Sequence, residues 1–264
     1  MPELTRHGLR VERRSLIAWA VGFVLVVLLY LVFYPSIKSN ADAYRKAIEG
    51  LPEALRAFAG GNDPVSPAGY LHGQFFASLG AILFFVFTIG RGARAIAGDE
   101  QEGTLELVLA APISRTRIVL ERALTLGLET AAVAVVTWLA FWLLDPLFDL
   151  GAVSAGNLAA ATGSLALGAY VLGLLALAIG ALTGQKALAL GVGAAVASAA
   201  FLFTTLAPLS EALTSQRALS PGWQAFGYKP VVTGADWGAL GVLAAEAAVL
   251  LALAVWGFRR RDAR

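Results

Sequence analysis

Two carboxylates in this sequence stand inside long apolar runs, where their chemistry is unusual. Glu129 and Glu246 are each flanked on both sides by Ala, Leu, Val and other apolar residues. A carboxylate is costly in hydrocarbon and faces either a bundle interior or a wet cavity. One interpretation is a site for a cationic substrate, a proton or an ion, and the other is a protonated carboxyl hydrogen-bonded to a neighbouring helix. No basic residue is expected at a matching depth in the predicted spans to neutralise either carboxylate. This absence favours a protonated carboxyl group or a bound cationic substrate.

The segment Arg91–Arg117 is the second candidate, because it is a long polar stretch between two strongly apolar ones. It begins with basic residues, passes through an acidic knot, and ends in a second basic pair. Asp99 followed by Glu102 can cap the start of a helix, where carboxylates suit the positive end of the helix dipole. Glu100 is the third member of the acidic knot. The sequence therefore predicts a helix that starts near Glu102.

The residues after the knot give this predicted helix one apolar side. Its stripe and its acidic rim comprise Glu102, Leu105, Glu106, Val108 and Leu109, with the apolar members at spacing i, i+3, i+4. A proline stops the helix, and the serine two residues later can cap the next one; these are Pro112 and Ser114. Such a helix could dock on a partner, whereas the alternative is a solvated loop that touches nothing.

Several function classes are excluded or weakened by what the sequence lacks. It has no cysteine and only two histidines, far apart at His7 and His72, so disulfides, thiolate metal sites and histidine metal centres are not supported. The formal net charge of +2 gives no electrostatic basis for binding nucleic acid. No phosphate-binding glycine loop, nucleophile elbow or zinc-protease motif occurs. We therefore do not expect an enzyme.

Apolar runs provide the scaffold for these side chains. Of the 264 residues 58% are hydrophobic and 14% charged, which is too apolar for a soluble domain of this length. A membrane-spanning helix needs about 20 mostly apolar residues. We predict an all-α, polytopic helical membrane protein forming one domain, residues 1–264. Its six expected spans are Ser15–Tyr34, Tyr70–Ile89, Ile118–Leu144, Asn157–Leu182, Ala187–Leu206 and Trp237–Phe258.

The positions of the basic residues predict the orientation of the spans. Segments on the same side as the N-terminus carry most of the lysines and arginines, and such segments face the cytoplasm. The basic residues of these segments are Arg6, Arg10, Arg13, Arg14, Arg91, Arg94, Arg115, Arg117, Arg122, Lys186, Arg259, Arg260, Arg261 and Arg264. Both termini and the segment Arg91–Arg117 are therefore expected in the cytoplasm.

Two long outer loops are expected, residues 35–69 and 207–236. In the first, Asn40 or Asp42 can cap an amphipathic helix whose stripe continues through Ile48, Leu51, Leu55 and Phe58, with a break near Pro52 and an end at Gly60-Gly61. In the second, aromatic residues are spaced like an interfacial belt, which we favour over a substrate role. They are Trp223, Phe226, Tyr228 and Trp237.

The stretch from Ile96 through Glu106 to Arg115 resembles the signature of ABC transporter permeases of the type-2 exporter class. The resemblance rests on the acidic knot, the run Gly103-Thr104-Leu105-Glu106, and the ending Pro112-Ile113-Ser114-Arg115. It extends to the layout of six spans with cytoplasmic termini and long outer loops. The motif is typical of the superfamily and carries little information about the substrate.

The resemblance implies a permease subunit of an ATP-driven exporter in a plasma membrane, expected to be prokaryotic. Such a chain would form a homodimer and pair with two ABC ATP-binding subunits. It would bind no cofactor itself, because ATP and Mg belong to the partner ATPase. The helix at Glu102–Ala110 would be the coupling helix seated on that ATPase, and Arg6–Arg14 would flank the contact. The substrate would be a drug-like, lipid-like or other hydrophobic compound, moved outward by alternating access.

Two other functions stay open on the sequence. One is an ion or small-cation exporter, or a permease for copper-enzyme maturation, in which Glu129 and Glu246 would be the sites. The other is a membrane scaffold or sensor that binds a cytoplasmic partner without transport.

Overall fold

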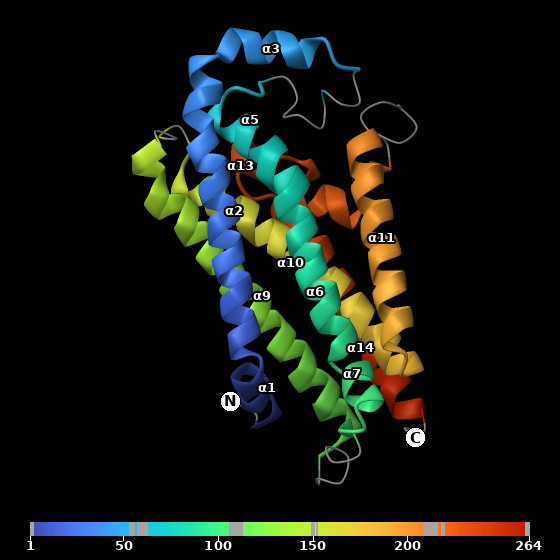
Figure 1. The fold of residues 1–264 in the computed structure, drawn as a ribbon. Coiled ribbons are helices and arrows are strands. Elements are labelled where there is room, and N and C mark those ends of the chain that lie inside the picture. The colour runs from blue at the N-terminus through green and yellow to red at the C-terminus, as the bar shows by residue number, and fades with distance from the viewer. Residues whose placement is uncertain are drawn as a thin grey trace.

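A computed structural model describes residues 3–52, 56, 63–105, 113–148, 151, 153–207, 216–217 and 220–261. Within these ranges the chain is helical and has no strand, as the sequence predicts. Both ends of the chain lie at the same end of a helix bundle, which we name the terminal face (Figure 1). The opposite end is the distal face.

Among the described residues, six helical segments are long and apolar enough to cross a membrane, and they coincide with the six predicted spans. Five are single helices, and the second is built from the consecutive elements α5, η1 and α6. Their bounds are α2 (Arg13–Ser39), α5 (Pro67–Leu71), η1 (His72–Leu79), α6 (Gly80–Arg94), α9 (Arg115–Phe148), α10 (Ala155–Thr183), α11 (Lys186–Leu206) and α14 (Trp237–Arg260).

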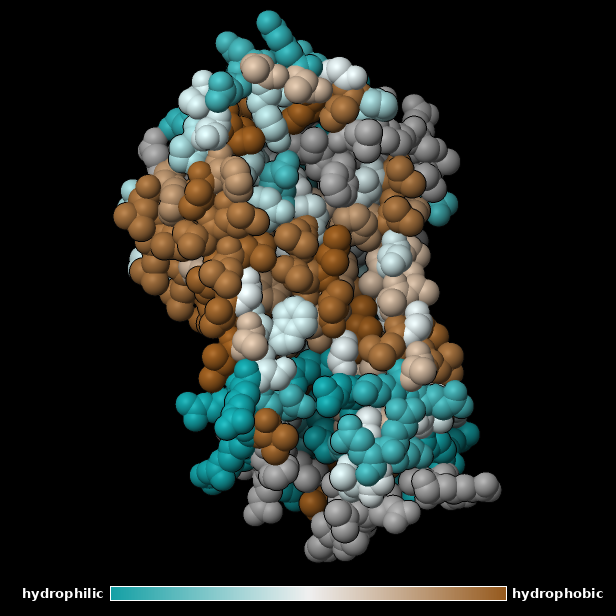
Figure 2. All heavy atoms as spheres, in the orientation of Figure 1, coloured by the Kyte–Doolittle hydropathy of each residue, from teal (hydrophilic) through white to brown (hydrophobic). Residues whose placement is uncertain are grey.

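Most spans are longer than the apolar runs that predicted them. α2 continues through Pro35 to Ser39, so the first distal loop begins later than residue 35. α9 has 34 residues and is about 51 Å long at ~1.5 Å per residue, more than hydrocarbon requires. Figure 2 shows the result on one face of the molecule, where an apolar belt lies between two hydrophilic ends.

α10 is the central helix of the bundle. It packs against α6, α9, α11 and α14, and it is apolar all round, as expected of a helix buried on every side. Small residues allow the close approach: a Cβ added at Gly92 of α6 would lie 2.0 Å from the backbone oxygen of Gly173 in α10. Packing of this kind depends on small residues because lipid gives the helices no hydrophobic drive to associate.

The second span is not a continuous α-helix. Its middle element η1 is π-helical and contains two residues outside helical geometry, Ala77 (φ −103°, ψ 15°) and Ser78 (φ −143°, ψ −114°). The Ser78 hydroxyl donates a hydrogen bond to the backbone oxygen of Gln74 and so provides a partner where the helix is interrupted. The regular helix resumes at Gly80 and carries the chain to the terminal face.

The segment before the sixth span is buried between helices, which corrects the prediction of an interfacial belt for part of it. It contains η4 (Trp223–Gly227) and α13 (Pro230–Thr233), and η4 contacts α10, α11, α14 and η1. Phe226 is only 2% exposed and packs in the core. Trp237, which is 80% exposed, fits the belt prediction.

Short helices flank the bundle at both faces. α3 (Ala41–Glu49) crosses the distal face (Figure 1), where the sequence predicts an amphipathic helix. Asn40 stands at its N-cap position, but its side-chain amide donates to the Ser36 oxygen and makes no cap hydrogen bond. Leu55, Phe58 and Gly60-Gly61 lie outside the described residues. At the terminal face, α1 (Glu3–Val11) packs on α9 and α7 (Ala97–Gln101) follows the second span.

Candidate coupling site at the terminal face

The polar segment between the second and third spans begins with a compact turn. α7 ends in a Schellman motif: the Thr104 N–H donates to the Asp99 oxygen over 2.9 Å, and the Gly103 N–H donates to the Glu100 oxygen over 3.1 Å. Gly103 has φ +71°, a left-handed conformation that glycine adopts at low cost. Glu102, Gly103 and Thr104 therefore end a helix.

This turn corrects the prediction that Asp99 and Glu102 cap the start of the next helix, whose predicted course from Glu106 to Ala110 lies outside the described residues. Glu102 is the C-cap residue of α7, and Asp99 lies inside that helix instead of capping the next. Leu105 is buried in the apolar cluster at the terminal face, with Ile96, Ile118 and Phe258. Glu106, Val108, Leu109 and Pro112, which the sequence assigns to the coupling helix and its end, lie outside the described residues.

Two of the three residues in the acidic knot form ion pairs inside the chain. Asp99 pairs with Arg122 of α9, and Glu100 pairs with Arg261, which follows α14. All four side chains are mostly buried, with exposed fractions of 17–24%. The Arg261 guanidinium also donates to the Gly180 oxygen of α10 over 3.3 Å. α7 is thereby fixed to three of the six spans.

The electrostatics of Asp99 reflect this burial. Desolvation raises the pKa of Asp99, and the neighbouring Arg122 guanidinium opposes that rise. Glu102 differs from Asp99 and Glu100, because it lies on the exposed surface with Gln101, Gly103 and Thr104. Of the acidic knot, Glu102 is therefore the carboxylate that is exposed at the surface.

Arg115 fixes the start of α9 to the end of α14. Its Nη1 donates to the backbone oxygens of Phe258, over 3.1 Å, and of Arg261. Its guanidinium also lies 5.6 Å from the centroid of the Phe258 ring, within the range of a cation–π contact. The predicted cap is confirmed, since the Ser114 hydroxyl accepts a hydrogen bond from the Arg117 N–H over 3.3 Å.

Glu129 has a basic neighbour, contrary to the expectation from the sequence. The Nε of Arg91 lies 3.4 Å from Oε2 of Glu129, and the same guanidinium pairs with Glu12, between α1 and α2. Arg91 belongs to the last turn of α6, and the side chains of Arg91 and Glu129 are 10% and 3% exposed. The sequence argument fails because α6 extends past its apolar run and brings Arg91 against α9.

These charged groups line a cavity of about 350 Å³ between α1, α6, α7 and α9. Arg91 Nη2, Arg122 Nε and Glu129 Oε1 are buried there without a hydrogen-bond partner among the described residues. A polar cavity of this size can hold ordered water, which would satisfy such groups. In the described part of the chain, no three His, Cys, Asp or Glu side chains lie close enough together to hold a metal ion.

Glu246 lies in a different environment from Glu129. It is half-buried in α14, where the side-chain amide of Gln224 in η4 hydrogen-bonds its carboxyl group. Gln224 is 1% exposed, so η4 brings a polar partner into the bundle interior. The structure thus places the two carboxylates in separate polar contacts, each with a partner from another element, and does not unite them in one site.

Sequence reasoning missed the partners that complete the site. In the sequence, Arg122 and Arg261 indicate only the orientation of the spans, because their acidic partners are 23 and 161 residues away. Glu121 was also missed: its carboxylate accepts from the Thr5 N–H over 3.2 Å and pairs with Arg117 at 2.7 Å, which fixes α1 on α9. The spacing of Arg117 and Glu121, i and i+4 on one helix, was the available signal.

Comparison with known proteins identifies the family of the chain. Residues 3–263 match the model of a family described as ABC-2 family transporter protein. A search of curated proteins finds no match. The family model covers nearly the whole chain, and the six apolar helices are those expected of a permease that crosses the membrane several times. The chain therefore belongs to the ABC-2 family of transporter proteins.

Proposed function

We propose that this chain is the permease subunit of an ATP-driven exporter, energised by two separate ATP-binding subunits that dock on its terminal face. That face would be cytoplasmic, because 14 of the 20 lysines and arginines belong to its segments and positive charge marks the inner side. The assembly would be a homodimer, the simplest closed arrangement for a six-span unit. Its substrate would be a drug-like or lipid-like hydrophobic compound.

The observation that carries this proposal is the way α7 is held. Its exposed C-terminal turn, Gln101–Thr104, is open to a partner, while Asp99 and Glu100 are paired with Arg122 and Arg261. A partner that moves the turn would pull on α9 and on the end of α14 together. Force from an ATPase would then reach the third and sixth spans without first deforming the segment that links the second and third spans.

The connection of α7 with α9 and α14 would allow the permease to work by alternating access. Closure of the ATPase pair on ATP would displace α7 toward the dimer axis, and α6 and α9 would move with it as rigid bodies. The proposed compound, held between the two permeases or taken laterally from the bilayer, would then leave at the distal face. The Arg91–Glu129 contact weakens the competing proposal of a cation exporter, because Glu129 already has a basic partner.

The test is reconstitution with an ABC ATP-binding protein from the same organism. The wild-type chain should purify with it as a two-plus-two complex whose hydrolysis responds to lipid or substrate. Reversing the charge of Glu102, together with Glu106, should abolish the complex, because the exposed carboxylate would no longer pair with basic groups of the ATPase.

A matched variant separates this effect from general damage. Asp42 and Glu49 are exposed acidic residues of α3 at the distal face, and their reversal changes the net charge equally. The complex should survive that change. A chain that purifies alone would instead support a scaffold or sensor without transport. A full-strength complex after reversal at Glu102 and Glu106 would overturn the proposed pairing of these carboxylates with the ATPase.

A further inference from the structure

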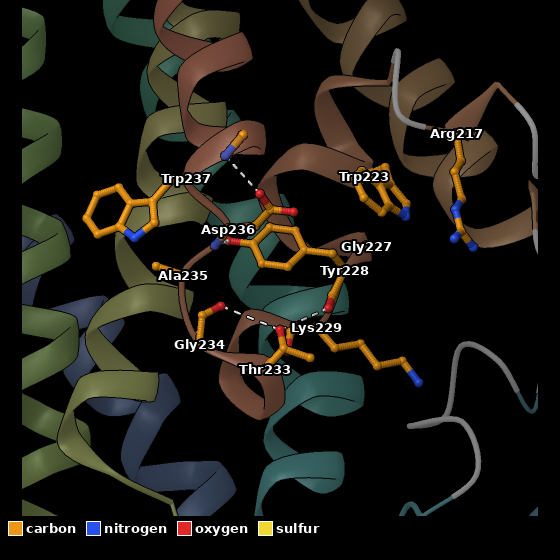
Figure 3. A pocket seen from close by; sticks show the side chains of 11 residues that line it. Arg217, Trp223, Gly227, Tyr228, Lys229, Thr233, Gly234, Ala235, Asp236 and Trp237 are labelled. Carbon is orange, nitrogen blue, oxygen red and sulfur yellow. Dashed lines mark hydrogen bonds between the residues drawn. The ribbon is translucent and has the colours of Figure 1, made fainter.

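A second pocket lies at the distal face, remote from the coupling site. Its volume is about 750 Å³, and it is formed by Arg217, the end of η4, the loop through α13, and the first turn of α14. Figure 3 shows Arg217 and Lys229 on the side of Trp223 and Tyr228 away from Trp237. The pocket therefore has two cationic groups on one side and an aromatic ring on the other.

The two cations have no ion-pair partner in the described part of the chain. The guanidinium of Arg217 lies 5.5 Å from the centroid of the Trp223 ring, a contact that orients it without neutralising its charge. The carboxylate at this pocket, Asp236, is occupied: its Oδ1 accepts from the N–H groups of Gly238 at 2.8 Å and Ala239 at 3.1 Å. Asp236 thus caps α14 and does not pair with either cation.

Lys229 is held in a fixed backbone conformation. It has φ 61° and ψ 58°, and it is the non-glycine residue with positive φ among those described. Its N–H donates to the Phe226 oxygen over 3.0 Å, and its own oxygen accepts from the Val232 N–H over 2.8 Å. A lysine in a left-handed conformation persists only where its surroundings fix it, so its side chain leaves the backbone in one set direction.

The surroundings put this pocket at the boundary between hydrocarbon and water. Trp237 is the first residue of the sixth span and is 80% exposed, and tryptophan at a span end marks the headgroup level. Below it, α14 presents an apolar exposed face that includes Val242 and Val249, 45% and 59% exposed. A molecule with a polar head in the pocket could lay an apolar tail along this face.

We propose that this pocket binds the anionic headgroup of a phospholipid in the distal leaflet. The phosphate would lie between Arg217 and Lys229, the glycerol part against Trp223 and Tyr228, and the acyl chains along α14. The site is independent of ATP coupling and requires only that the chain spans a membrane. Because η4 and its neighbours also contact Glu246 through Gln224, a bound lipid would touch the segment that precedes the sixth span.

The experiment compares two short-chain lipids on the purified full chain in detergent. Dioctanoyl phosphatidylglycerol should bind about tenfold more tightly than dioctanoyl phosphatidylcholine, since basic residues at a membrane surface attract anionic lipid. The double variant Arg217→Gln, Lys229→Gln should bind both lipids alike. The matched double variant Arg45→Gln, Lys46→Gln removes two exposed charges from α3 and should keep the preference.

Three results would overturn the proposal. The first is equal binding of both lipids by the wild-type chain. The second is a preference for phosphatidylglycerol that survives in the Arg217→Gln, Lys229→Gln variant, or that disappears equally in the Arg45→Gln, Lys46→Gln variant. Either outcome would mean that the preference does not depend on this pocket. The third is full displacement of the lipid by millimolar glycerol phosphate, which would identify a site for a soluble phosphate.

Discussion

The Nε of Arg91 lies 3.4 Å from Oε2 of Glu129, where the second and third spans meet near the terminal face. The same guanidinium reaches Glu12, so one arginine connects the start of the first span with two others. The contact places a cation beside a carboxylate inside a span, and it connects α6 with α9. The two acidic partners of Arg91 differ, because Glu129 lies inside a span and Glu12 lies at the start of one.

Arg91→Gln should destabilise the protein more than Glu129→Gln. The first change leaves Glu129, which is 3% exposed, without its cation, and an uncompensated buried charge costs on the order of 3–5 kcal/mol. The second leaves Arg91 paired with Glu12 and should cost about 1–2 kcal/mol. Thermal unfolding in detergent measures both. A double variant should regain part of the loss, and a larger cost for Glu129→Gln would contradict the assignment.

The Glu100–Arg261 pair should be required for coupling. Glu100→Arg should sever the connection of α7 to the end of α14, so ATP hydrolysis should persist while substrate transport falls at least about tenfold, a coupling energy on the order of 1–3 kcal/mol. Adding Arg261→Glu restores opposite charges and should restore transport. Transport and hydrolysis are measured together in proteoliposomes.

An exposed pair serves as the control for that experiment. Asp42 and Arg45 of α3 are 3.6 Å apart with side chains 92% and 50% exposed, so Asp42→Asn should change neither activity. If Glu100→Arg transported normally, or if the charge swap failed to rescue it, α7 would not transmit force through Arg261.

The spans could be predicted because the bilayer imposes a length and an apolar composition on each of them. The pairs at the terminal face could not, since a single sequence carries no information that brings Glu100 to Arg261 across 161 residues. Burial of the η4 segment was missed for another reason: a short stretch with Trp223 and Phe226 has the composition of an interfacial belt and of a buried turn alike. For the end of α7 a signal was present, because glycine after an acidic turn is typical of a helix C-terminus.

Gly103→Ala should loosen the turn that is proposed to meet the ATPase. Alanine at φ +71° costs about 1 kcal/mol, so the hydrogen bond from the Thr104 N–H to Asp99 should open more often. Hydrogen exchange at the Thr104 amide should accelerate severalfold. Gly103→Asn should be milder, because asparagine tolerates the left-handed region better. Unchanged exchange in the alanine variant would mean that the turn does not depend on this conformation.

Gly92→Ala and Gly90→Ala should have opposite outcomes although the two glycines lie in one helix. A Cβ at Gly92 would lie 2.0 Å from the Gly173 oxygen, a backbone atom of the central helix that cannot turn aside. Relief of this overlap requires α6 and α10 to separate, which should cost on the order of 1–3 kcal/mol or more.

A Cβ at Gly90 meets no heavy atom within 4 Å, so Gly90→Ala should be neutral or stabilise the helix by up to about 1 kcal/mol. Thermal unfolding of the two variants in the same detergent is the measurement. Because both changes add one methyl group to the same turn of α6, only contact with α10 distinguishes them. Equal stability of the two would mean that α6 and α10 are not in direct backbone contact at Gly173.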